Sequence, residues 1–434
     1  MTSMDRYEKY RPLIERTLEN YQVQHLARKY DFTKESLVSR LLVAEINKNM
    51  EAAEASIGIT RVKPFCLYIK KGTKEAVLPL FSPHYLEPML KGESFNAARS
   101  MVAGELAKIY KKSFPSSIGD DFLNTIYSWP RFRFRSGRKY KNNLAKKPLL
   151  YNKEDNLKWD KFISSINPAS PLKRINVLDA SAPDKVIEKL TEFVKEEVGF
   201  GNILARQLVQ DIITIRNIVC PRTRELKSGE MPMLVTHVSA RLSEDTTTRF
   251  RQLAPVIVTV LSKEEQSDFP SNAVEYLNTF KKRIMRITFE AYKQNGLLTL
   301  AEMQWIFMIS ATRISEVIRS VQCEHNIIIP TPGTVLDAGR SMTHKDIIVK
   351  LHLEGLNVKE ISRITHHSPR SVDSYIETFE AVLILYLYRL PVQLMSRILG
   401  RGVTLIHEHL KLIDEVYADV TEIKKDLIRK GVSF

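Results

Sequence analysis

The feature that most constrains this sequence is an apolar spacing that occurs three times in its last third. Each time, apolar residues stand seven and four positions before, and four and eight positions after, a turn residue. The turn residues are Ser310, Ser368 and Gly402, and the apolar residues are Met303, Ile306, Ile314 and Ile318, then Ile361, Ile364, Val372 and Ile376, then Met395, Ile398, Ile406 and Leu410. A short helix, a tight turn and a second crossing helix bury one stripe from each helix at these offsets. The spacing therefore predicts three consecutive helix-turn-helix units.

The middle unit has the clearest boundary residues. Asn357 can cap its first helix and Ser368 its second. Pro369 fits the first turn of that second helix, where a missing N–H costs nothing. This arrangement resembles the helix-turn-helix of response-regulator output domains and of many transposases. The alternative interpretation is a three-helix packing motif that serves protein contacts and no DNA.

The outer two units differ from the middle one in their flanking residues. In the first unit Thr299 is the expected cap, and residues 326–340, rich in β-branched residues and Pro-Gly turns, follow the second helix. This run suggests a wing, with a plain connecting loop as the alternative, and Arg340 at its end could reach phosphate or the minor groove. The third unit has a loose turn at Gly400 and is either a degenerate copy or a set of capping helices.

The residues that could touch DNA are the outward positions near the start of each second helix. They are Thr312, Arg313 and Glu316, then Arg370, Ser371 and Ser374, then Arg401, Val403 and Thr404. Arginine can pair bidentately with guanine, and serine and threonine can reach phosphate or either base edge. A solvated surface is the alternative role for each of them.

A basic aromatic segment lies far upstream of these units. Residues 122–153 contain no acidic residue, and arginines alternate with Phe132 and Phe134. As a strand, this alternation places Arg131, Arg133 and Arg135 on one face, and Arg138, Lys139 and Lys141 extend the charge. Three interpretations stay open: a phosphate-binding strip, stacking of the phenylalanines on unpaired bases, and an ordinary solvated face.

Charge and composition restrict the class of partner. A net charge of +15 favours a polyanion, either nucleic acid or an anionic membrane surface. The three cysteines are far apart in the sequence and form no disulfide framework. The first residues are too charged for a signal peptide. The longest apolar run, near residues 381–387, is too short to span a bilayer. We therefore expect a cytoplasmic protein, associated with the nucleoid when bound to DNA, that does not interact with membranes.

The expected fold is mainly α with small β elements. Helical spacing occurs at 36–55, 95–112, 186–197 and 203–218, and extended runs occur at 64–69, 76–81, 231–238 and 256–261. The expected regions are an α+β region at 1–115, a basic segment and linker at 116–170, an α+β region at 171–270, a helix-turn-helix at 271–342, a second at 343–382, and a third with a terminal helix at 383–434.

Several short motifs also resemble a known family. They are GLLTLAEM at 296–303, PTPGT at 330–334, THK at 343–345, EG at 354–355 and THHSP at 365–369, together with residues 222–230 and VIVTVLSKEE at 256–265. These motifs resemble the prokaryotic family designated domain of unknown function 1670, over roughly residues 200–415. The resemblance implies helix-turn-helix content and no established activity.

The sequence carries no motif of a known enzyme. It lacks a Walker loop, GxGxxG, HExxH and GxSxG, and we read Cys323 with His325, and His366 with His367, as structural. No cofactor or metal is expected. We expect sequence-specific duplex DNA binding, by a transcription regulator or a mobile-element accessory protein. One alternative is a DNA-processing enzyme of transposase or recombinase type, for which Asp120, Asp121, Asp211 and Asp245 are the candidate acidic residues. The other alternative is a helical protein-interaction scaffold, and the oligomeric state and effector stay open.

Overall fold

The computed structural model describes residues 10–32, 37–114, 164–166, 184–240, 252–267, 270, 272–325, 327–336, 343–429 and 431. The described residues up to Pro332 form one compact unit, and those from Gly333 onward form a second. Most of them are helical, and the strands form two small sheets, so the expected fold class is confirmed. The division into units differs from the six expected regions, because most of the segment expected to form the first helix-turn-helix belongs to the first unit.

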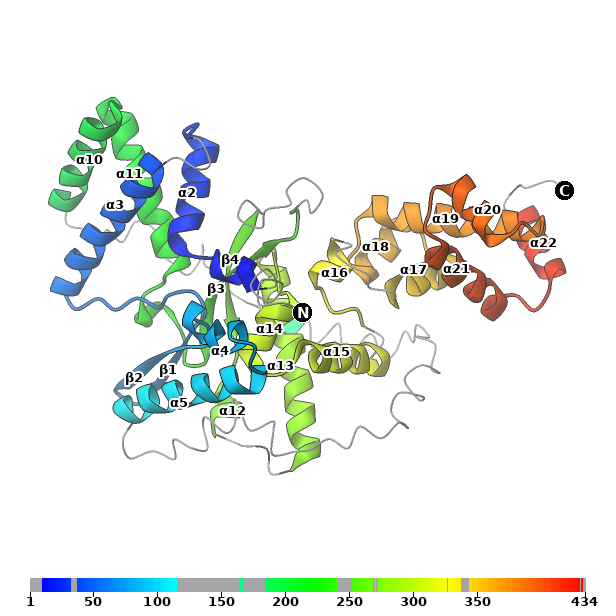
Figure 1. Ribbon diagram of the computed structural model, residues 1–434, viewed down its shortest axis with the longest axis horizontal. Helices are drawn as coiled ribbons and strands as arrows, with labels where there is room; N and C mark the ends of the chain where they lie inside the picture. Colours follow the sequence, from blue (N-terminus) through cyan, green and yellow to red (C-terminus); the bar gives the residue numbers. More distant parts are fainter. Residues whose placement is uncertain are drawn as a thin grey trace. The chain divides into compact units, whose positions relative to one another are not determined.

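Four helices of the first unit lie side by side (Figure 1). They are α2 (Leu18–Lys29), α3 (Leu37–Ser56), α10 (Asp184–Val198) and α11 (Asn202–Val219). Leu26, Ile46 and Leu208 are fully buried in their shared core. A buried polar link supports the packing, since the amide of Gln22 donates to Asn47 Oδ1 at 3.3 Å and to the carbonyl of Ile212 at 3.0 Å.

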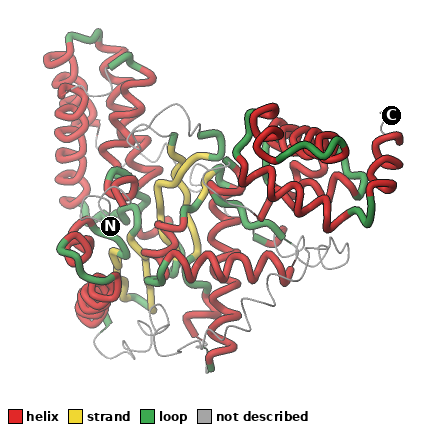
Figure 2. The backbone as a smooth tube through the Cα atoms, turned by 45° about the vertical axis from the view of Figure 1, so that its right-hand side comes forward, coloured by secondary structure: helices red, strands yellow, loops and turns green. Residues whose placement is uncertain are grey.

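Two antiparallel sheets form the middle of the first unit (Figure 2). The hairpin β1 (Cys66–Lys71) and β2 (Lys74–Pro79) stands beside a sheet of order β4-β3-β5, made of β3 (Glu230–His237), β4 (Leu253–Thr259) and the two-residue β5 (Gly296–Leu297). Every residue of β3 from Glu230 to Thr236 is buried, because β3 is the central strand of its sheet and both faces of the sheet are covered. The extended runs predicted from sequence are confirmed.

The remaining helices of this unit pack around the sheets. They are η1 (Pro83–Leu86), α4 (Glu87–Leu90), α5 (Phe95–Ser113), η3 (Thr223–Glu225), α12 (Lys263–Ser267), α13 (Ala273–Lys293), α14 (Leu300–Phe307) and α15 (Ala311–His325). The largest core side chain is Trp305 of α14, which is fully buried and makes edge-on contacts with Tyr10, Phe81 and Phe95. The core of the unit is therefore built from segments almost 300 residues apart.

Helix α14 is held in this core by polar contacts as well. Glu302 and Thr299 form a capping box at its start. The second oxygen of the Glu302 carboxylate accepts from Arg16, whose guanidinium also donates to Thr236 Oγ1 on β3 at 2.9 Å. Both charged side chains are buried, at 4% and 0% exposure. The N-terminal segment thus contributes the charge partner of a helix cap in the C-terminal half of the chain.

The second unit is entirely helical in its described residues. It contains α17 (Thr343–Leu353), α18 (Val358–Thr365), α19 (Pro369–Leu387), α20 (Val392–Leu399), α21 (Val403–Val416) and α22 (Val420–Arg429), preceded by the short α16 (Pro332–Val335). Ile361, Val372 and Ile376 share one core with α17, and Phe379, Met395 and Ile406 share another with α21 and α22. The long helix α19 therefore contributes to both cores.

The predicted apolar spacing is confirmed at all positions but one. Ile318, Ile364 and Leu410 are half-buried, and the other predicted positions are buried except Ile398, which is 56% exposed. The prediction for Ile398 was wrong because no described helix covers that side of α20. In the described part of the predicted wing, residues 327–336, there is no strand, and Pro332 opens α16 because its fixed φ suits a first helical turn.

The exposure of Ile398 leads to a first prediction. Ile398→Ala should change the free energy of unfolding by no more than about 0.5 kcal/mol, because little apolar surface is buried there. Ile364→Ala, at the equivalent position of α18, should cost about 1–2 kcal/mol for a half-buried side chain. Urea denaturation of both variants measures the difference, and equal losses would show that Ile398 is covered in solution.

Candidate nucleic-acid interface

The helix pairs α14–α15, α18–α19 and α20–α21 share one local geometry. In each pair an eight-residue first helix ends at a residue in the left-handed conformation, with φ of 51° at Met308, 58° at His366 and 61° at Gly400. Two residues further on, Ser310, Ser368 or Gly402 directly precedes the second helix. One left-handed residue ends a helix and redirects the chain within a few residues. The first helices thus have the same length and the turns the same geometry, despite different sequences, whereas the second helices differ in length.

Side chains fix the turn between α18 and α19. Asn357 caps α18 in a capping box with Glu360, and Ser368 Oγ accepts from the amide of Ser371 at 3.1 Å, so both predicted caps are confirmed. His367 is buried, and its Nδ1 donates to the carbonyl of Thr365 at 2.9 Å. This histidine therefore belongs to the structure of the turn, as the sequence analysis expected.

Helices α19 and α21 run parallel, with their N-terminal ends beside each other. Three contacts follow one another along both helices: Arg401 Nη2 donates to Ser374 Oγ at 3.0 Å, the rings of Phe379 and His409 are 6.0 Å apart, and Tyr386 Oη donates to Asp414 Oδ1 at 3.4 Å. Successive contacts advance in the same direction on both helices. The positive ends of two helix dipoles therefore lie on one side of the second unit.

The predicted DNA-contacting residues of the second unit lie on that side. Arg370, Arg401, Val403 and Thr404 are exposed, and Ser371 and Ser374 are half-buried. The structure brings Arg401 and Ser374 together, although they were predicted for different units. Asp373 and Glu377 were not among the predicted residues, but they are exposed and share the helix face of Arg370 by their spacing of three and seven residues. We call Arg370, Asp373, Ser374, Glu377 and Arg401 the α19 surface.

The candidates of the first helix pair have different surroundings. Residues 302–309 are buried, so α14 is a core helix of the first compact unit. At the start of α15, Thr312 is exposed, whereas Arg313 donates to Glu316 at 2.7 Å. This internal ion pair reduces the charge that either residue offers to a partner. Arg340 lies outside the described residues, as do Arg131, Arg133, Arg135, Arg138, Lys139 and Lys141.

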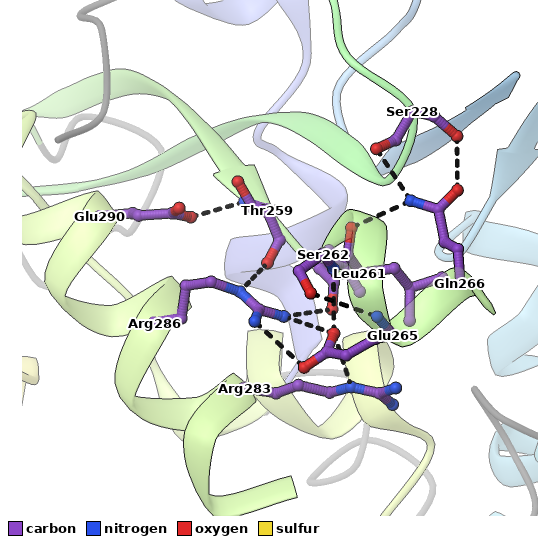
Figure 3. A network of polar contacts seen from close by, with 10 residues as sticks. Ser228, Thr259, Leu261, Ser262, Glu265, Gln266, Arg283, Arg286 and Glu290 are labelled. Atoms are coloured by element: carbon purple, nitrogen blue, oxygen red, sulfur yellow. Dashed lines mark hydrogen bonds and ion pairs between the residues drawn. The ribbon is translucent and has the colours of Figure 1, made fainter. Parts of the chain in front are cut away.

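A second polar cluster lies in the first unit (Figure 3). Glu265 of α12 accepts from Arg286 at 2.7 Å and from Arg283 at 3.2 Å, both on α13. Arg286 also donates to the carbonyls of Thr259 and Val260, at the end of β4. The cluster therefore ties the end of β4 to α12 and α13, and the VIVTVLSKEE motif supplies part of it.

The remaining contacts of this cluster reach the loop before β3. Gln266 donates to the carbonyl of Ser228 at 3.0 Å and accepts from its hydroxyl at 2.7 Å (Figure 3). Burial raises the pKa of Glu265, but hydrogen bonding by Arg286 and the charges of both arginines outweigh burial, so its pKa is lowered. Burial raises the pKa of Glu290, which accepts from the amide of Thr259 at 2.6 Å. Glu265 and Glu290 therefore connect α12, α13 and the end of β4, and their role in this cluster is structural.

Neither a metal centre nor an ionised thiol is found where the structure describes the relevant side chains. No group of three His, Cys, Asp or Glu side chains among them could hold a metal ion. Asp211, a candidate acid, accepts from Tyr30 at 2.7 Å and from Gln207 at 2.9 Å, and also pairs with Lys29. Burial raises the pKa of the Cys66 thiol to about 11 and that of Cys220 to about 12. Both thiols are therefore protonated at neutral pH.

The described residues form a mainly α-helical protein with two small antiparallel sheets and three helix pairs of similar local geometry. The family described as "Protein of unknown function (DUF1670)" matches residues 194–412, just over half of the chain. The chain belongs to this family, as its motifs indicated. No curated protein and no solved structure matches it significantly. The family match begins near the end of α10, includes β3, β4, the Figure 3 cluster and the first two helix pairs, and ends within α21 of the third pair.

None of the described helices is long and apolar enough to cross a membrane.

Proposed function

We propose that this protein binds duplex DNA in a sequence-specific manner through the α19 surface, with α18–α19 acting as a helix-turn-helix. The observation that carries the proposal is the parallel packing of α19 and α21, which gathers Arg370, Ser374 and Arg401 at two helix N-termini. Helix N-termini favour phosphate, and exposed arginines can reach phosphate or guanine. This combination supports DNA as the partner.

The chemistry of the α19 surface favours base reading over simple charge attraction. Arg370 can donate to guanine, and Asp373 and Glu377 can accept from the amino group of cytosine. Residues 333–434 contain 14 Lys and Arg against 13 Asp and Glu, so they contribute little to the net charge of +15. Residues 122–153 contain nine Lys and Arg and no acidic residue. We propose that this basic segment supplies the sequence-independent phosphate attraction.

The proposed biological role is that of a transcription regulator or an accessory protein of a mobile element, acting in the cytoplasm on the nucleoid.

A second candidate function is a protein-interaction scaffold, and one observation favours it. Leu394, Ile398 and Val403 are 39%, 56% and 41% exposed on α20 and at the start of α21. Exposed apolar side chains close together are typical of protein contacts.

A DNA-binding measurement tests the proposal. After selection of a preferred duplex from a random pool, Arg370→Ala should weaken binding to that duplex about 5- to 150-fold, which corresponds to about 1–3 kcal/mol for one base contact. Lys411→Ala removes the same charge from an exposed site eight residues beyond the start of α21 and should have little effect.

Two results would contradict this assignment. If Arg370→Ala and Lys411→Ala reduced the affinity for the selected duplex equally, Arg370 would contribute only its positive charge and would contact no base. Failure of the wild-type chain to shift any duplex at low salt would reject DNA binding and leave the scaffold as the better candidate.

A further inference from the structure

We propose that the two helix pairs of the second unit read one continuous stretch of DNA, and not two half-sites on successive turns. In this arrangement α19 enters the major groove, and the turn before α21 contacts the phosphate backbone that borders the same groove. The inference rests on the proposed function and specifies the DNA geometry that the α19 surface recognises.

The distance between the two helix starts carries this inference. Ser374 is six residues into α19, so it lies about 8 Å along the helix from its beginning, and Arg401 in the turn before α21 contacts it at 3.0 Å. Packed helices lie about 8–10 Å apart. Two recognition helices in successive major grooves must be about 34 Å apart. The starts of α19 and α21 are far too close to occupy two grooves.

The packing prevents the pairs from separating to reach two grooves. Phe379, Val382, Met395 and Ile406 are buried in one apolar core shared by α19, α20 and α21. The contact between Phe379 and His409 lies in the middle of this interface. Separating α19 from α21 to about 34 Å would expose this core, which costs more free energy than a few DNA contacts return.

The position of Arg401 defines its part in recognition. Its guanidinium is exposed but anchored by the Ser374 hydroxyl, at the edge of the face that carries Arg370. Gly402, which precedes α21, offers no side-chain cap, whereas Ser368 caps α19. The first turn of α21 thus keeps its amides available beside a fixed positive charge. That combination suits a backbone phosphate, whereas Arg370 on the open helix face suits a base.

Cleavage of DNA from two tethered positions tests the geometry. An iron chelate that generates hydroxyl radicals is attached to Asp373→Cys on α19 or to Thr404→Cys on α21, in the full chain, at protein concentrations that saturate the selected duplex. We expect the two cleavage centres to lie within roughly 5 base pairs of each other. The wild-type chain, labelled in the same way, controls for its native cysteines. Glu377→Cys and His407→Cys, one turn further along each helix, provide a second pair.

Each result of the cleavage experiment is decisive. Centres about ten base pairs apart, or cleavage from the α19 cysteines alone, would overturn the single-site inference and leave DNA binding by α19 intact. Absence of cleavage from both α19 cysteines in a chain that still binds the duplex would overturn the proposed function of the α19 surface itself.

The salt dependence of binding tests Arg401 separately. Arg401→Ala should weaken specific and random duplexes by similar factors and make the slope of log K against log salt shallower by about one unit. Arg401→Lys should restore the slope because it keeps the charge. A change in the preferred sequence, or an unchanged slope, would overturn the assignment of Arg401 to the backbone.

Discussion

Glu302→Ala is expected to destabilise the first compact unit by about 3–5 kcal/mol, because it leaves a buried guanidinium without its carboxylate. The Arg16 side chain is 4% exposed, and Glu302 is fully buried. The hydroxyl of Thr236 accepts from Arg16 at 2.9 Å and does not depend on Glu302. The same substitution also removes half of the capping box that begins α14.

The chain contains a matched control for this prediction. Glu360 occupies the equivalent position in α18 and forms the same capping box with Asn357, but its side chain is exposed. Glu360→Ala should therefore cost below about 1 kcal/mol, as expected for a capping contact alone. The difference between the two variants isolates the buried ion pair from the cap.

Calorimetric unfolding measures both variants in the full chain. Glu302→Gln adds a test of charge, since it keeps the shape and a capping oxygen but loses the negative charge. We expect its transition to lie between those of Glu302→Ala and the wild type. If Glu302→Ala cost no more than Glu360→Ala, the Arg16 contact would contribute no net stability.

Gly229→Ala is expected to cost about 2–5 kcal/mol, from backbone strain and from steric overlap together. Gly229 has φ of +89°, and a Cβ atom there would lie 1.9 Å from the carbonyl oxygen of Leu261. Gly229 cannot move away from that oxygen easily, because its backbone is held on both sides. Its amide donates to the carbonyl of Tyr68 at 2.8 Å, and its carbonyl accepts from Val260 at 2.9 Å.

Gly355 provides a control that separates backbone strain from steric overlap. Its φ of +90° is nearly the same, but no atom lies within 4 Å of the position of its Cβ. Gly355→Ala should therefore cost only the strain of the left-handed conformation, about 1–2 kcal/mol. Chemical denaturation of both variants gives the comparison, and a similar loss in both would show that the loop before β3 relaxes around the added methyl group.

The sequence determined the local structure of this protein with few errors. The caps Thr299, Asn357 and Ser368 are confirmed, and so are most of the buried positions of the three helix pairs. These features depend on residues within about four positions of each other, through side-chain-to-amide hydrogen bonds and the helical repeat. A single sequence contains all of that information.

The composition of the candidate site was only partly predictable. Arg370 and Arg401 could be named from their places near the start of two helices, and Asp373 and Glu377 could have been found from the same helical spacing. The hydrogen bond between Arg401 and Ser374 could not, because the two residues belong to different helix pairs. It depends on the direction in which α21 packs on α19.

Only the tertiary structure decided what surrounds each helix pair. Helix α14 is a core helix because Tyr10, Arg16 and Phe81, remote in sequence, cover it, whereas Ile398 on α20 stays exposed because no described element lies over it. A similar spacing of apolar residues thus leads to full burial in α14 but leaves an exposed isoleucine on α20. The physical reason is that the free energy of burial comes from long-range neighbours, and the sequence near a helix records only which face could be buried.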